Sequence, residues 1–127
     1  MVAAVNAHGP RLHAIVAPEN LPERFAAAAV AVTAGGTTVY ELALLRTPML
    51  LVCTAENQRR TCERFGAAGA AHYAGWHADL TPEAFARVLA TVAADAELLG
   101  RLSARAAELV DGLGAVRVVE AMMGGGL

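Results

Sequence analysis

The sequence predicts an α/β protein with a Rossmann-like parallel sheet, flanking helices and a helical C-terminal region. Three observations predict it. Short apolar runs alternate with helical segments as far as Tyr73, and a glycine turn joins one of these runs to the helix after it. From Thr81 onward the apolar residues recur at helical spacing alone. Strands alternating with helices imply right-handed crossovers and a parallel sheet that is covered on both faces.

The length of 127 residues indicates a single domain over residues 1–127. Hydrophobic residues make up 56% and charged residues 17%, which excludes a disordered chain. No run of about 18 apolar residues occurs, so we expect no membrane span. The N-terminus lacks the basic stretch and apolar core of a signal peptide, which favours a cytoplasmic location. A net charge of -2 gives no basic field, so we expect no nucleic-acid partner.

The first half of the chain is expected to hold strands and helices in turn. Residues 12–16 predict a strand, and residues 21–28 a short helix with Pro22 in its first turn. Residues 30–33 predict the second strand and residues 39–45 the helix that follows the glycine turn.

The third strand is expected at residues 49–53, whose continuous apolar character is typical of a parallel strand buried on both faces. A loop at residues 54–57 leads to a helix over residues 58–68 that stops at Gly69. Residues 70–73 predict a fourth, weaker strand.

Three helices are expected after Tyr73. Thr81 followed by Pro82 is typical of a helix start, and the next helix is expected to begin near Asp95. The Gly-rich stretch at residues 111–114 breaks that helix, and a last one is expected over residues 115–123.

The front of the chain differs from a complete nucleotide-binding half, which opens with a strand. Residues 1–7 resemble the tail of a helix, and the first strand is expected only at residues 12–16. One interpretation is that the chain lacks its first strand. An edge or an apolar face of the sheet would then be covered by another chain, as a homo-oligomer or with a different partner.

The glycine turn Gly35-Gly36-Thr37-Thr38 is the strongest candidate for a binding site. A turn that leaves a strand and opens a helix has unpaired backbone N–H groups, and the helix dipole adds partial positive charge there. Such a place suits a phosphate, although a plain helix start has the same residues.

No catalytic residue or metal site can be assigned from the residue pattern. Cys53 and Cys62 lack metal-site spacing and are expected to be small buried thiols. There is no Gly-x-Ser-x-Gly motif, and the absence of lysine excludes a Walker sequence. His8 and His13 precede or lie in the first expected strand, while His72 or His77 would either face a ligand crevice or be an ordinary surface histidine.

Together, several segments resemble the C-terminal half of GT-B glycosyltransferases, the glycosyltransferase family 28 C-terminal domain. The resemblance is closest to the UDP-sugar hydrolase of pseudaminic acid biosynthesis and covers roughly residues 12–123. It rests on residues 30–41, 48–52, Glu56-Asn57-Gln58, residues 66–70 and residues 111–115 with Arg117-Val118.

The resemblance implies half of a GT-B fold that binds UDP or a UDP-sugar and needs no cofactor. Gly35, Gly36, Thr37 and Thr38 would line the pyrophosphate. By the same resemblance, Glu41 would accept hydrogen bonds from the ribose hydroxyls, and Asn57 and Gln58 would contact the sugar or the phosphates. Taken alone, Glu41 is equally a solvated helix charge, and Asn57 and Gln58 are equally caps of the next helix.

The family's catalytic base, a histidine on an N-terminal glycine loop, belongs to the other half, which has no counterpart in these 127 residues. Two hypotheses follow. The chain is the UDP-sugar-binding half or subunit of a nucleotide-sugar hydrolase or glycosyltransferase that acts with an N-terminal half. Alternatively, it is a stand-alone, non-catalytic nucleotide-binding or oligomerising scaffold domain.

Overall fold

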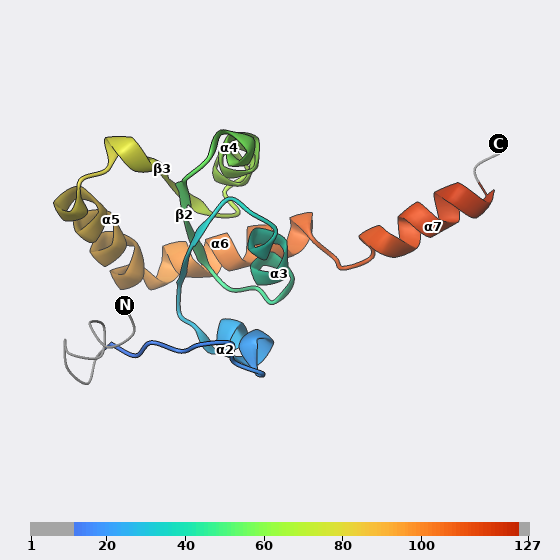
Figure 1. Ribbon diagram of the computed structural model, residues 1–127, viewed down its shortest axis with the longest axis horizontal. Helices are drawn as coiled ribbons and strands as arrows, with labels where there is room; N and C mark the ends of the chain where they lie inside the picture. Colours follow the sequence, from blue (N-terminus) through green and yellow to red (C-terminus); the bar gives the residue numbers. More distant parts are fainter. Residues whose placement is uncertain (1–11, 125–127) are drawn as a thin grey trace.

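The computed structural model describes residues 12–124 and confirms the α/β fold class (Figure 1). Three parallel strands form one sheet in the order β1-β2-β3, namely β1 (Ala31–Ala34), β2 (Met49–Cys53) and β3 (His72–Trp76). The helices are α2 (Leu21–Ala27), α3 (Thr38–Leu44), α4 (Arg59–Ala67), α5 (Pro82–Ala94), α6 (Ala96–Leu109) and α7 (Gly114–Gly124). Two short 3-10 helices, η1 (Glu56–Gln58) and η2 (His77–Asp79), follow β2 and β3.

The strand β2 is the centre of the sheet and of the core. Its residues alternate between two faces, so Met49, Leu51 and Cys53 point into the main core cluster while Leu50 points to the opposite face. All four of these side chains are fully buried. The apolar run therefore identified a strand that is covered on both faces, as expected of a central parallel strand.

The helices α3 and α4 cover one face of the sheet. Their buried residues join the odd-numbered residues of β2 in one core cluster, to which α3 contributes Val39, Leu42 and Ala43 and α4 contributes Cys62 and Phe65. The helix α5 contacts β3. The side chain of Phe85 in α5 shares a hollow with Val52, so α5 lies over the opposite face.

The helix α6 seals the edge at which the strands begin. Ser103 Oγ donates a hydrogen bond of 2.6 Å to the carbonyl oxygen of Arg46, which precedes β2. Arg105 Nε donates one of 3.3 Å to the carbonyl oxygen of Ala68, which precedes β3. Because parallel strands all enter the sheet at the same edge, α6 leaves the opposite, carboxyl edge open.

The strand expected at residues 12–16 is wrong. This segment is extended but does not join the sheet, and Leu12, Ile15 and Val16 are about half exposed or more. An apolar run becomes a strand only where a neighbouring strand can pair with its backbone. As a result, β1 is an edge strand with β2 as its one partner among the described residues.

The fourth expected strand forms as β3, but it begins two residues later than predicted. The chain reverses at Gly69, whose φ of 69° is the left-handed conformation that favours glycine. The amides of Ala70 and Ala71 then donate to the carbonyl oxygen of Phe65, at 2.9 and 3.3 Å. These two residues are bound to the end of α4, so pairing with β2 starts at His72, opposite Leu50.

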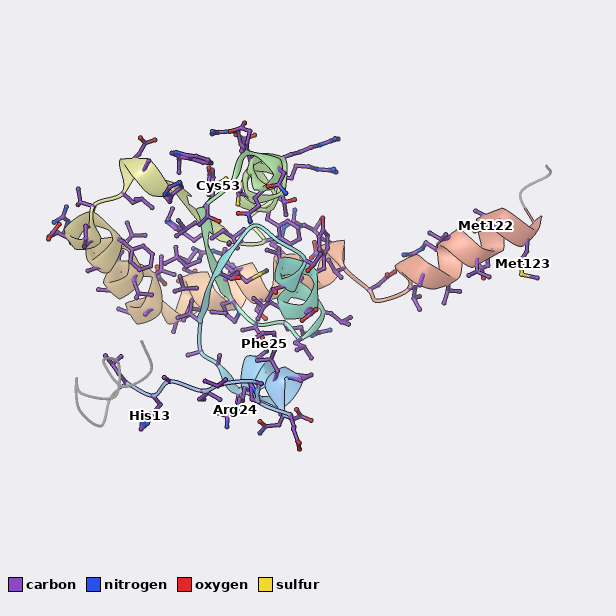
Figure 2. The ribbon with its side chains drawn as sticks, viewed as in Figure 1. His13, Arg24, Phe25, Cys53, Met122 and Met123 are labelled. Carbon is purple, nitrogen blue, oxygen red and sulfur yellow. The ribbon has the colours of Figure 1, made fainter. Side chains whose placement is uncertain are left out.

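The helix α7 extends away from the rest of the molecule (Figure 1). Every residue from Asp111 to Gly124 is exposed, including several large apolar side chains. Figure 2 shows Met122 and Met123 near the far end of α7, well away from the sheet. None of the helices in residues 12–124 is long and apolar enough to cross a membrane.

Candidate functional site at the carboxyl edge of the sheet

Three connections meet at the open edge of the sheet. The turn at residues 35–37 follows β1, residues 54–58 follow β2, and η2 follows β3. The register pairs Ala34 with Val52 and Cys53 with Trp76, so the three strands end side by side. Ligands of open α/β sheets bind at this edge, which makes it the candidate site.

The two glycines of the turn have different structural roles. Gly35 is buried, and a Cβ atom there would lie 2.4 Å from Cys62 Sγ and 3.0 Å from the carbonyl oxygen of Gln58. A Cβ atom on Gly36 would meet nothing within 4 Å. Gly35 is therefore needed for close packing between the turn and α4, while Gly36 leaves the backbone open to a ligand.

The start of α3 presents hydrogen-bond donors that have no partner among residues 12–124. The first bonds of the helix run from Val39 N to Gly36 O, at 3.3 Å, and from Tyr40 N to Thr37 O, at 3.0 Å. Within the described residues, the amides of Gly36, Thr37 and Thr38 donate to no acceptor. Thr37 is the N-cap residue, but its side chain makes no capping bond. Unpaired amides at a helix start are suited to an anion.

Gln58 is the predicted site residue that the fold brings against this turn. Its Cβ atom would lie 3.1 Å from a Cβ atom placed on Gly35. Its Oε1 atom accepts hydrogen bonds from Thr54 N at 3.2 Å and Thr54 Oγ1 at 2.9 Å. Although Gln58 is the N-cap residue of α4, its side chain does not cap that helix, so the capping interpretation is wrong for Gln58. The amide nitrogen of its side chain stays available to a ligand.

Asn57 and Glu41 are both exposed, on different sides of the site. Asn57 lies in η1, and its side chain forms no hydrogen bond within residues 12–124. Glu41 lines an apolar groove of about 220 Å³ between α2 and α3, together with Leu21 and Phe25. Its carboxylate has no hydrogen bond or ion pair in the described part of the chain. Glu41 therefore faces α2, whereas Asn57 lies in the connection that follows β2.

A stack of three side chains at the same edge was missed by the sequence analysis. The guanidinium of Arg59 lies 4.8 Å from the centre of the Trp76 ring, and the His77 ring lies 4.8 Å from the Trp76 ring. Arg59 also donates two hydrogen bonds to Glu56, of 2.9 and 3.0 Å, which lower the pKa of that carboxyl group. The one signal in the sequence was the position of Trp76, the only tryptophan, beside the expected fourth strand.

The structure separates the two histidines that were considered for the site. His72 begins β3 opposite Leu50, away from the carboxyl edge. His77 follows β3 and lines a hollow of about 300 Å³ with Val52 and Phe85, so it does lie at the carboxyl edge. His13 is exposed in the segment before α2, and His8 lies outside the described residues.

Cys53 and Cys62 are free, buried thiols, which confirms the prediction. Cys53 Sγ lies 3.4 Å from the carbonyl oxygen of Ala55. Burial, together with the neighbouring Cys53, raises the pKa of Cys62 to about 11, so its thiol stays protonated and has a packing role. Residues 12–124 contain no group of three or more His, Cys, Asp or Glu side chains that could hold a metal ion.

The fold is that of a Rossmann-like α/β protein whose sheet has an open carboxyl edge. Searches against protein-family models, curated proteins and solved structures found no match to this chain. The GT-B resemblance therefore remains a prediction from the sequence motifs.

Proposed function

We propose that this chain is the UDP-sugar-binding half or subunit of a nucleotide-sugar hydrolase or glycosyltransferase. The observation that carries the proposal is the set of unpartnered amides at Gly36, Thr37 and Thr38, which lie beside Gln58 at the open edge. A diphosphate offers several anionic oxygens, and backbone amides can donate to them without a nearby side chain.

In this proposal the glycine turn binds the diphosphate and Glu41 binds the ribose. Gly36 allows the phosphate to approach the backbone, since a Cβ atom placed there would have no neighbour within 4 Å. The free carboxylate of Glu41 accepts hydrogen bonds from both ribose hydroxyls. Asn57 and the amide nitrogen of Gln58 donate to the sugar or to the phosphates.

Catalysis would need a second protein component. Cleavage of a sugar–phosphate bond requires an activated water or hydroxyl group as well as a stabilised leaving group. The donors at the turn stabilise the diphosphate leaving group. The activating base would come from an N-terminal half, as the GT-B resemblance implies.

Binding and turnover can be tested separately. We expect UDP and UDP-sugars to raise the melting temperature of the purified protein more than ADP does, since only a ligand that binds the folded state stabilises it. Release of UDP from a UDP-sugar is measured in parallel. Stabilisation without UDP release supports a binding half, and a lack of stabilisation by all three ligands contradicts nucleotide binding.

Two variants test the assigned residues. Gly36→Val should abolish UDP binding while the protein still folds, because its side chain enters the space that the phosphate needs. Glu41→Ala should weaken binding by about tenfold through loss of the ribose hydrogen bonds. Glu63→Ala, which changes another exposed helix carboxylate, is the matched control and should bind UDP normally. Unchanged affinity in both site variants would remove the turn and Glu41 from the site.

A non-catalytic nucleotide-binding domain is the second candidate function. It rests on the same unpartnered amides of Gly36, Thr37 and Thr38 as the first candidate, and it differs in needing no second half. This function would be supported over the first if the chain binds UDP but no UDP is released from a UDP-sugar after a candidate N-terminal half is added.

A further inference from the structure

A groove among the helices carries two arginines that have no ion pair within the described part of the chain. It lies between α3, α4 and the end of α6, with a volume of about 500 Å³, and Tyr40, Phe65 and Leu109 line it. The rings of Tyr40 and Phe65 meet edge to face, with their centres 5.7 Å apart. Arg60 and Arg64 also line the groove, four residues apart along α4.

These two arginines differ from the paired arginines of the surface, and they are the two that line this groove. Arg59, Arg101, Arg105 and Arg117 each form an ion pair with a carboxylate. The guanidinium groups of Arg60 and Arg64 form no hydrogen bond or ion pair within residues 12–124. The groove therefore combines an aromatic floor with two cations that lack a counter-charge.

The helix α7 carries the complementary features. Val116, Val119 and Met123 follow the spacing of one helix face and are at least half exposed. Glu120 lies on this same face and forms no hydrogen bond or ion pair in the described chain. An ionised carboxylate within an apolar face is costly to bury, and a cation opposite it offsets that cost.

We propose that α7 of one copy of the chain binds in this groove of a second copy, with Glu120 between Arg60 and Arg64. In a two-fold dimer each chain gives its α7 to the other, so both grooves and both apolar faces are buried. The lengths agree, because Arg60 to Ala68 spans about 12 Å of helix and Val116 to Met123 about 10 Å.

Local contacts at the start of α7 favour a second copy over the chain's own groove. Asp111 accepts a hydrogen bond from Leu113 N at 3.0 Å and pairs with Arg117. The backbone of Gly112 lies against Leu44, since a Cβ atom there would be 3.2 Å from Leu44 Cδ1. These contacts fix the start of α7, which extends away from the rest of the molecule (Figure 1).

Light scattering after gel filtration, over a series of protein concentrations, tests the dimer. The wild-type protein should be a dimer, and Glu120→Arg should weaken dimerisation by about 100-fold because it places like charges together. The double variant Arg60→Glu with Arg64→Glu should have the same effect. A mixture of the two variants should form a heterodimer, in which the charges are complementary again. Glu83→Arg, on the exposed first turn of α5, is the matched control and should remain a dimer.

Three results would overturn this inference. The first is a wild-type protein that is monomeric at every concentration, and the second is a dimer that Glu120→Arg does not affect. The third comes from the double variant Arg64→Cys with Val119→Cys, which should form a disulfide between chains under oxidation. A disulfide within one chain would show that α7 binds its own groove. The inference is independent of nucleotide binding, because these residues lie outside the glycine turn, so its failure leaves the UDP proposal unaffected.

Discussion

At the scale of single residues, the glycine turn shows how two identical neighbours serve different purposes. Gly35 lies where a side chain would collide with Cys62 Sγ at 2.4 Å, whereas the position of Gly36 is open. Packing inside the protein therefore requires the first glycine. The second is required only if a ligand approaches the backbone.

This difference predicts unequal effects on stability. Gly35→Ala should lower the free energy of unfolding by about 1–3 kcal/mol through overpacking, while Gly36→Ala should change it by less than about 0.5 kcal/mol. Urea denaturation measures both. Combining Gly35→Ala with Cys62→Ala should recover part of the loss, because the two side chains compete for the same space. Equal effects of the two glycine variants would contradict this assignment.

The Cys62 thiol predicts a dependence of stability on alkaline pH. Its pKa of about 11 in the folded protein is above the ordinary value of 9.0, because burial disfavours the thiolate. The unfolded chain loses this proton first, so the stabilisation is complete below about pH 9 and is lost as the pH rises toward about pH 11. The loss should approach about 3 kcal/mol.

Urea denaturation across this pH range measures the effect, with Cys62→Ala as the control. Tyr73 also has a raised pKa, so the difference between wild type and variant isolates the contribution of Cys62. Parallel pH profiles for the two proteins would show that the thiol of Cys62 does not contribute.

At the scale of elements, the two helix starts expected near Thr81 and Asp95 are confirmed. Thr81 Oγ1 accepts a hydrogen bond from Ala84 N at 3.1 Å, and Asp95 Oδ1 accepts one from Leu98 N at 2.9 Å. Capping depends on residues within one turn of the cap. This is why local sequence located both starts correctly.

Removing the cap of α5 should therefore cost stability. Thr81→Ala should lower the free energy of unfolding by about 1 kcal/mol, whereas Thr81→Ser keeps the hydroxyl group and should be nearly neutral. Thr91→Ala is a control in the same helix, because the Thr91 hydroxyl bonds to Arg87 O and caps nothing. A loss from Thr91→Ala as large as that from Thr81→Ala would argue against capping. Thermal denaturation compares the three variants.

At the scale of the whole molecule, α6 and α7 contribute differently to stability. Leu102 and Ala106 of α6 are buried, and Ser103 joins α6 to the chain before β2. All of α7 is exposed. We therefore expect α6 to be part of the folding unit and α7 to be dispensable for the folding of a single chain.

Truncation tests this division. A chain that ends at Leu113 should keep its sheet and the same free energy of unfolding, apart from any contribution of dimerisation. A chain that ends at Asp95 lacks α6 and should not fold, because it exposes the core beside Ala106. Circular dichroism measures the secondary structure of both truncated chains, and urea denaturation at low protein concentration measures their free energy of unfolding. Loss of the fold on removal of α7 alone would contradict the assignment.

Much of the architecture could be predicted because its signals are local. The apolar run of β2 was placed to the residue, and the prediction for α2 was one residue too long. Residues 12–16 have an equally good strand sequence but form no strand, because pairing depends on a neighbour that is remote in the chain. The glycine turn of the candidate site could be predicted because its residues are adjacent in the sequence. The stack of Arg59, Trp76 and His77 could not, because it requires residues from different elements.

The sequence by itself determined the class of fold, the helix caps, the buried thiols and the position of the glycine turn. Each depends on residue type and short-range periodicity, which a single segment contains. Only the tertiary structure decided that Gly35 lies against Cys62, that Gln58 contacts the turn instead of capping α4, and that α6 closes the opposite edge. These features depend on where the crossovers bring together segments that are far apart in the chain, and no local sequence pattern specifies which segments meet.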